Sequence, residues 1–86
     1  MDEKYLQRLQ TYQISEARST TAGKLNTTDW YITRKTEREI EIPADIAAER
    51  ATVIDKFNTF EAAILGATEE NIYTVIREAK EAFNEK

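Results

Sequence analysis

The sequence predicts a small all-α bundle of three to four helices that ends in an antiparallel helical hairpin. Three observations support this fold class. The chain has 86 residues but only 2 Gly and 1 Pro, a composition that favours helices over turn-rich β-structure. Apolar residues recur at helical spacing in several segments, and short polar stretches separate these segments. We expect residues 1–86 to form one domain, since the chain is too short for two hydrophobic cores.

The first helix is expected at residues 3–18. Its inward-facing residues are expected at intervals of four and three, at Tyr5, Leu9 and Tyr12. Ile14 lies off this stripe, so we interpret it as an ordinary exposed side chain, the alternative being a contact with a partner. The small polar residues 19–23 follow, and Gly23 is expected to end the helix.

The second helix is expected at residues 29–38. Thr27 or Thr28 can cap it, and the carboxylate of Asp29 favours the positive end of the helix dipole. One helical turn separates the members of two pairs, Trp30 with Arg34 and Tyr31 with Lys35. Cation–π contacts or packing of the basic stems are therefore expected along either edge of this helix.

Trp30 is the only tryptophan of the chain and has two interpretations. It is either the anchor of a small core, because one indole buries a large apolar area, or a surface residue at an interface. We favour the core anchor, with Tyr31 facing another direction and available to a partner.

Residues 39–42 are expected to be extended. Ile42 precedes Pro43, and a residue before proline is excluded from helical conformation by steric clash. Pro43 itself suits the first position of a new helix.

The third helix is expected at residues 44–65 and carries the strongest apolar pattern. The pattern consists of Ile46, Val53, Phe57, Phe60 and Ile64. Arg50 takes the missing place in it, and a buried arginine needs a partner, for which Asp29 and Glu37 are the candidates. The heptad-like spacing has two explanations, a hairpin with the last helix or a coiled coil between chains.

The fourth helix is expected to follow a short turn. Gly66 is the expected left-handed cap of the third helix, and Thr68 is expected to cap the fourth, with acidic residues in its first turn. The apolar stripe of this helix is Ile72, Val75, Ile76, Ala79 and Phe83. Because the turn is short, the last two helices should be antiparallel.

The composition argues against several function classes. The chain has no cysteine and no histidine, so it lacks the residues of the usual catalytic triads and the commonest metal ligands. Carboxylates one turn apart, such as Asp45 with Glu49, are interpreted as solvated helix faces. We expect no enzyme activity, no cofactor and no metal site.

The charge distribution also bears on the partners. The net charge is −4, and residues 43–86 contain 5 basic and 9 acidic side chains, which disfavours binding to nucleic acid. No apolar run approaches the roughly 20 residues of a membrane span. The charged start of the sequence differs from a signal peptide, so we expect neither a membrane association nor secretion.

The segment 18–54 resembles a module found in tail assembly chaperones and tail-fibre-associated proteins of tailed bacteriophages. The pattern is an Arg, a Leu, Thr-Asp-Trp, a further Arg and Glu, Ile-Pro, an acidic residue and a last Arg. The matching positions are Arg18, Leu25, Thr28, Asp29, Trp30, Arg34, Glu37, Ile42, Pro43, Asp45 and Arg50. Related modules often have a glycine shortly before Ile-Pro, whereas this chain has none, so its turn must be formed differently.

The resemblance implies a phage protein, located in the virion or the host cytoplasm, that acts through protein–protein contacts. Its partners would be phage tail or other virion proteins, or further copies of itself. The alternative is a small acidic phage-encoded regulator or adaptor that binds a host protein. The resemblance singles out Asp29, Trp30, Tyr31, Arg34, Glu37, Pro43 and Arg50 as the residues of an interaction or structural motif.

Overall fold

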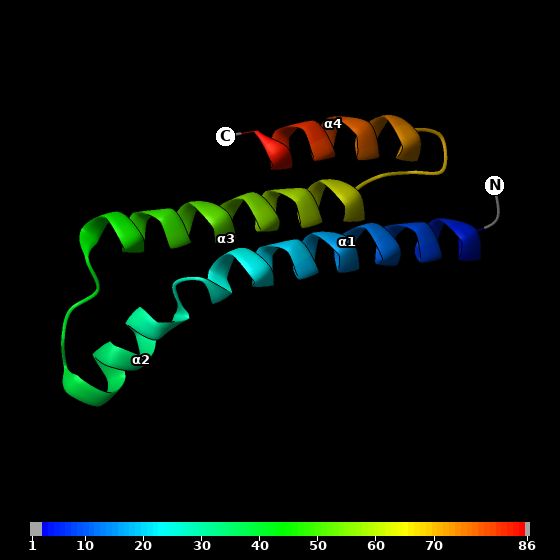
Figure 1. Ribbon diagram of the computed structural model, residues 1–86. Coiled ribbons are helices and arrows are strands. Elements are labelled where there is room, and N and C mark those ends of the chain that lie inside the picture. The colour runs from blue at the N-terminus through cyan, green and yellow to red at the C-terminus, as the bar shows by residue number, and fades with distance from the viewer. Residues whose placement is uncertain (1–2, 86) are drawn as a thin grey trace.

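A computed structural model describes residues 3–85, which form four helices and no strand. The helices are α1 (Glu3–Asn26), α2 (Asp29–Arg38), α3 (Ala44–Leu65) and α4 (Ile72–Asn84). Helices α1 and α3 lie antiparallel along most of their length, and α4 folds back along α3 (Figure 1). The predicted small all-α bundle and its C-terminal hairpin are therefore confirmed.

The core lies where α1, α3 and α4 meet. It contains Ile14, Ala17, Phe60, Ile64 and Phe83. The rings of Phe60 and Phe83 are 5.3 Å apart between centroids and tilted by 50°, a favourable edge-to-face type of contact. The predicted apolar stripes of α3 and α4 therefore supply most of the core, although Ile46 and Val53 near the start of α3 are only half-buried.

Helix α1 is longer than predicted, because it continues through Gly23 to Asn26. A glycine inside a helix costs only about 1 kcal/mol relative to alanine. The added turns bury Thr21 and half-bury Leu25, which offsets that cost. The expectation that Gly23 ends the helix was wrong.

The face of α1 that packs on the bundle was also predicted wrongly. Tyr5 and Tyr12 are 47% and 58% exposed, whereas Ile14, expected on the surface, is only 9% exposed. The buried face of this helix consists of Gln13, Ile14, Ala17 and Thr21. Two of these four residues are polar, so an apolar pattern alone did not reveal the face.

The turn between α3 and α4 differs from the prediction at both ends. Gly66 has a φ of −83° and ψ of −5°, so it is not a left-handed cap. Helix α4 begins at Ile72 rather than after Thr68, and the Thr68 N–H donates a 2.7 Å hydrogen bond to Oδ1 of Asn71. This bond closes the turn, and Ala67, the residue before Thr68, is buried.

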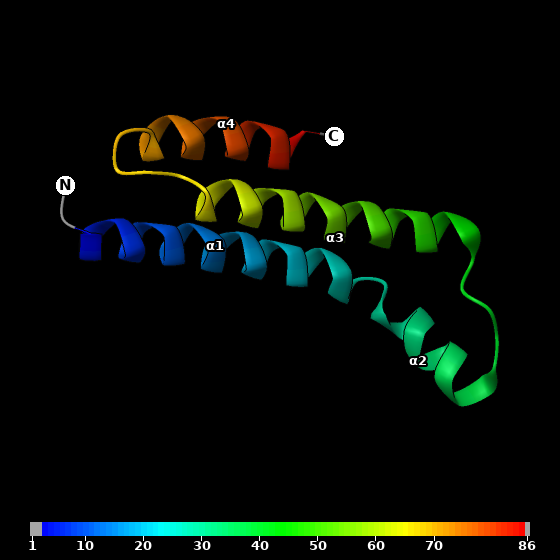
Figure 2. The same ribbon diagram turned by 180° about the vertical axis from the view of Figure 1, so that it is seen from behind.

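The molecule is elongated rather than compact. Its principal extents are 53 × 23 × 16 Å and its Cα radius of gyration is 16.0 Å, against about 12 Å for a compact chain of this length. Two features account for this shape (Figures 1 and 2): α2 projects from the end of the bundle, and α4 covers only the C-terminal half of α3.

Candidate interaction site

The start of α2 is fixed by contacts with the end of α1. Thr28 occupies the capping position, as predicted, but its side chain makes no capping hydrogen bond to α2. Its hydroxyl donates instead to the carbonyl oxygen of Leu25, at 3.2 Å. The Thr28 carbonyl in turn accepts a bond from the Tyr31 N–H, at 3.1 Å. Thr28 therefore joins the two helices rather than capping one of them.

Arg50 of α3 holds this junction from the other side. Its Nη1 lies 3.1 Å from Oδ1 of Asp29, and it donates to the Leu25 carbonyl at 2.9 Å and to Oγ1 of Thr28 at 2.7 Å. Of the two predicted partners of Arg50, the structure brings Asp29 to it. Only 17% of the Arg50 side chain is exposed. We call these four residues the Arg50 clamp; it sets the direction in which α2 leaves the bundle.

Trp30 is on the surface, 53% exposed, so its favoured interpretation as the core anchor was wrong. The reason is positional. Helix α2 extends beyond the end of the bundle and has no buried residue, so no element is close enough to cover the indole. The core is instead built from Ile and Phe side chains of the longer helices.

Trp30, Tyr31 and Arg34 form an aromatic–arginine cluster on α2. The two rings are stacked, with centroids 3.8 Å apart and an angle of 29° between planes. The guanidinium carbon of Arg34 lies 5.1 Å from the centroid of Trp30 and 5.2 Å from that of Tyr31. The predicted contact of Trp30 with Arg34 is present, whereas Lys35 pairs with Glu41 at 3.5 Å. The cluster is therefore a preformed, partly exposed arrangement of three large side chains.

The chemistry of the cluster suits a protein interface. Trp, Tyr and Arg are the residue types most enriched among those that dominate binding energy at interfaces. Nε of Arg34 is buried and has no hydrogen-bond partner among residues 3–85. Stacked rings and a held guanidinium lose little conformational entropy when a partner covers them.

The remaining motif residues shape the segment that follows. Glu37 is exposed on α2 and is not a partner of Arg50. Glu39 adopts a left-handed conformation with φ 56°, and its N–H bonds the Lys35 carbonyl at 2.9 Å. Glu39 thus ends α2 as the missing glycine would. Residues 39–43 are outside any helix, but the prediction that 39–42 are extended was wrong at Glu39, and Pro43 immediately precedes α3 rather than occupying its first position.

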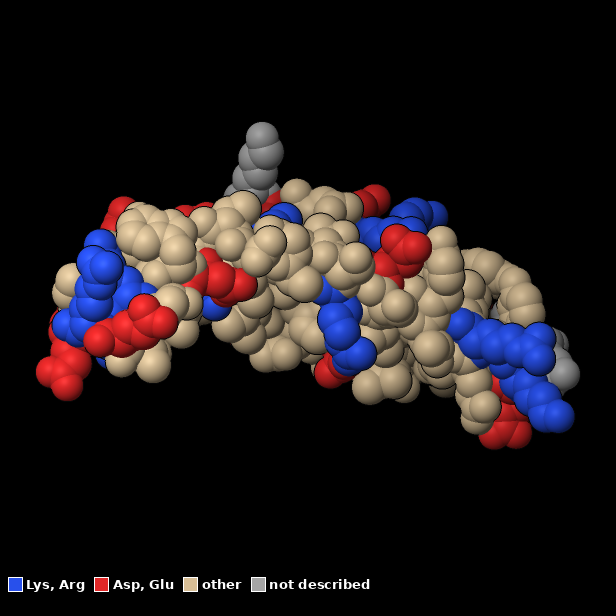
Figure 3. Space-filling view, turned by 60° about the horizontal axis from the view of Figure 1, so that its bottom comes forward, with Lys and Arg blue, Asp and Glu red and all other residues tan. Residues whose placement is uncertain are grey.

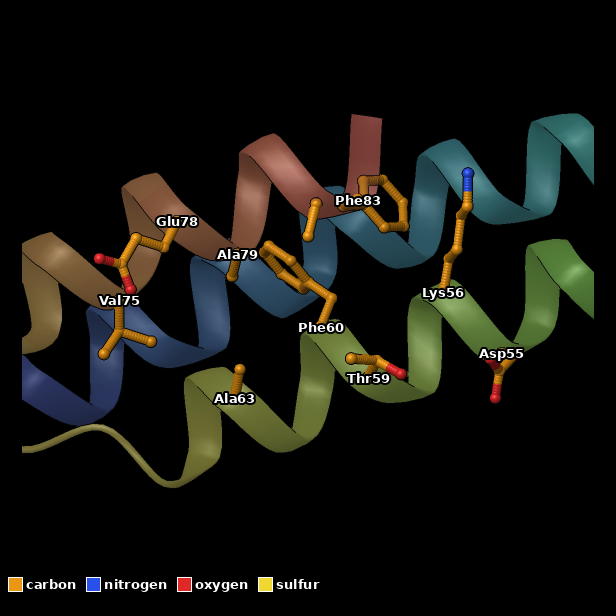
Figure 4. A pocket seen from close by; sticks show the side chains of 10 residues that line it. Asp55, Lys56, Thr59, Phe60, Ala63, Val75, Glu78, Ala79 and Phe83 are labelled. Carbon is orange, nitrogen blue, oxygen red and sulfur yellow. The ribbon is translucent and has the colours of Figure 1, made fainter. Parts of the chain in front are cut away.

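A second candidate surface is a hollow of about 430 Å³ between α3 and α4. Its apolar lining consists of Phe60, Ala63, Val75, Ala79, Ala82 and Phe83. Figure 4 shows these side chains from the two helices around the opening, with Asp55 and Glu78 at opposite ends. We call this hollow the α3–α4 groove. This groove was not predicted from the sequence. The pattern that could have indicated it is the alanines beside the apolar stripes of α3 and α4, because their small side chains leave space between the helices.

Two exposed tyrosines, one on α1 and one on α4, lie outside both surfaces and have a raised pKa: a hydrogen bond to Glu16 raises the pKa of Tyr12, and one to Tyr5 raises the pKa of Tyr73. Among the described residues, no three His, Cys, Asp or Glu side chains are placed to hold a metal ion. None of the four helices is long and apolar enough to cross a bilayer. On the face in Figure 3, charges of both signs are interspersed.

No protein-family model, curated protein or solved structure matches this chain.

Proposed function

We propose that this chain is a non-enzymatic protein that acts through protein–protein contacts in the structure or assembly of a phage tail. The observation that carries the contact function is the aromatic–arginine cluster, which stands on a projecting helix without burying its rings. The exposed part of Trp30 belongs to a group of three large side chains in contact with one another, rather than to an isolated surface residue. The Arg50 clamp holds α2 in place and so presents the cluster in one direction.

The assignment to a phage tail is supported by the resemblance of residues 18–54. The residues of that pattern fall largely on the structural unit just described: Leu25, Thr28, Asp29 and Arg50 make the clamp, and Trp30 and Arg34 make the cluster. The residues of the pattern thus attach α2 to the bundle and expose the aromatic–arginine cluster.

The alternative is a small acidic phage-encoded regulator that binds a host protein. Its net charge of −4 and its single presented cluster also suit such an adaptor. The two functions differ in where the protein ends up. A structural or assembly protein is found with tail or particle fractions, whereas a host-directed factor stays with host proteins in the lysate.

The test is gradient fractionation of cells infected with a phage that encodes a tagged copy of the chain. We expect the wild-type protein in tail or particle fractions, and the Trp30→Ala variant to be depleted there. Tyr12→Ala is the matched control, since Tyr12 is a similarly exposed aromatic residue outside the cluster. Recovery only with host proteins would reject the tail function in favour of the regulator, and equal recovery of both variants would reject the cluster as the contact.

A further inference from the structure

The α3–α4 groove is open although both of its walls belong to the packed bundle. Phe60 and Phe83 form its floor and are themselves buried in the core, while Ala63 and Ala82 on its walls are exposed. Neither of the other two described helices lies over it: α1 packs on a different side of α3, and α2 is at the far end of the molecule (Figures 1 and 2). The groove is therefore an apolar surface that the described chain leaves uncovered.

The charges at the groove and on α2 are complementary. Asp55 and Glu78 border the groove, and the one basic side chain there, Lys56, donates its ammonium to the carbonyl oxygen of Glu85. On α2, Asp29 is paired with Arg50. Lys35 is likewise paired with Glu41. The remaining charges of α2 are two basic and one acidic, namely Arg34, Arg38 and Glu37. Helix α2, with the exposed Trp30 and a small excess of positive charge, is therefore complementary to an apolar groove bordered by two carboxylates and one ammonium group.

The exposed area also fits a second copy. The chain has 6227 Å² of accessible surface, whereas a folded monomer of this mass is expected to expose about 5200 Å². The excess of roughly 1000 Å² is comparable to the about 800 Å² that each partner buries in a standard interface. The excess follows from the elongated shape of the chain, and one standard contact with a second copy would bury a comparable area.

We propose that the aromatic–arginine cluster of one copy binds the α3–α4 groove of a second copy. This inference rests on the proposed function, because it takes the cluster as a contact surface and names its partner. The two surfaces are different parts of the chain, so a two-fold axis between two antiparallel copies gives two identical contacts and a closed dimer. In each contact, Trp30 enters the apolar lining, and the basic residues of α2 face Asp55 and Glu78.

The test compares two single variants, each of which damages one half of the contact. Trp30→Ala removes the inserted ring, and Ala63→Trp fills the groove from an exposed position. By sedimentation equilibrium, we expect the wild type to have twice its chain mass of 9.9 kDa. Each variant should raise the dissociation constant at least about 10-fold. Ala51→Trp, which places the same ring at an exposed position of α3 outside the groove, should dimerise as the wild type does.

Mixing the two variants gives the decisive measurement. The Trp30→Ala chain retains its groove and the Ala63→Trp chain retains its cluster, so a 1:1 mixture should form a heterodimer with one intact contact. If Ala63→Trp does not fold, as judged by circular dichroism, the exposed pair Asp55→Lys/Glu78→Lys replaces it, and Arg34→Glu/Arg38→Glu on the other chain should restore binding. If the wild type forms species larger than a dimer and each variant prevents their formation, the same contact joins the copies head to tail. That result would also support the inference.

The inference would be overturned by a wild-type chain that remains monomeric at several hundred micromolar, or by variants that dimerise like the wild type. Failure of the mixture to associate, with both variants folded, would also overturn it. None of these results rejects the proposed function. That function fails separately, if Trp30 has no effect on recovery of the protein with tails.

Discussion

At the residue scale, Arg50 shows how one charged side chain replaces an apolar residue in a packing pattern. Its stem occupies a place in the stripe of α3, and its guanidinium reaches the α1–α2 junction, where it bonds a carboxylate, a hydroxyl and a carbonyl oxygen. A buried charge is tolerated when it is paired and its donors are satisfied. Asp29 is the first residue of α2 and directly follows Thr28 of the junction, so its carboxylate lies within reach of Arg50.

Replacing Arg50 with Met should lower the free energy of unfolding by about 1–3 kcal/mol, because it removes charge-assisted bonds and keeps the apolar stem. Urea unfolding followed by circular dichroism measures this change. Arg18→Met is the matched control: its ion pair with Glu61, at 3.3 Å, is 66% exposed on the arginine side, so its loss should cost only about 0–1 kcal/mol. Equal effects of the two substitutions would contradict the clamp.

The contact between Tyr5 and Tyr73 predicts a pH effect. Their hydroxyl oxygens are 3.0 Å apart, and this hydrogen bond raises the pKa of Tyr73 above its ordinary value of 10.0. A group whose pKa is raised in the folded state contributes stability below its unfolded pKa and loses that contribution as the pH rises through the folded value. This small contribution should therefore be present at neutral pH and disappear above pH 10.

Ultraviolet titration of the tyrosines checks this effect. Tyr5→Phe should return the pKa of Tyr73 towards 10.0, whereas the raised pKa of Tyr12, which depends on Glu16, should be unchanged. A titration curve identical to that of the wild type would mean that the two phenols do not meet in solution.

At the element scale, the length of α1 was decided by packing rather than by local signals. A stretch of Ser, Thr and Gly ordinarily marks a loop, but here it lies along α3 and remains helical through Asn26. The opposite case is α2, whose start and end were predicted correctly although it buries no residue. Local signals define a short helix that projects from the bundle, whereas tertiary contacts override them in a long helix that packs along its length.

Gly23→Ala tests this interpretation. An added Cβ at Gly23 meets nothing within 4 Å, and the residue is helical, so the substitution should stabilise the protein by about 0.4–1 kcal/mol. Gly66→Ala is the comparison: its φ is also negative, and its Cβ would meet the Ala62 carbonyl oxygen at an ordinary 3.4 Å, so we expect it to be near neutral. A clear destabilisation by Gly66→Ala, measured by urea unfolding, would instead indicate a left-handed cap at that residue.

At the scale of the whole molecule, the four helices do not form a compact bundle. The largest fully buried side chains are Ile64 and Ile72, and the first half of α3 has no fourth helix over it (Figure 2). A small core with a long, uncovered surface is typical of chains that complete their packing against another molecule. This shape is a second observation, beside the aromatic–arginine cluster, in favour of the proposed role in assembly.

Small-angle scattering measures the shape directly. For the Trp30→Ala variant, which lacks the proposed contact between copies, we expect a radius of gyration near the 16.0 Å of the Cα atoms. A value close to the about 12 Å of a compact chain would mean that α2 folds back on the bundle in solution. Dilution of the sample separates this outcome from any residual association.

The sequence by itself determined the fold class, the α3–α4 hairpin, both ends of α2 and the two candidate partners of Arg50. It did so because helical periodicity, proline and the pairing needs of a buried charge are local properties that can be read from residue types. Only the tertiary structure decided that Ile14 is in the core and Trp30 outside it, that Gly23 is helical, and that a groove lies between α3 and α4. These outcomes depend on which neighbour lies over each face and how far each helix extends beyond the others. The type of a residue alone does not determine its burial, because burial depends on contacts between segments that are distant in the chain.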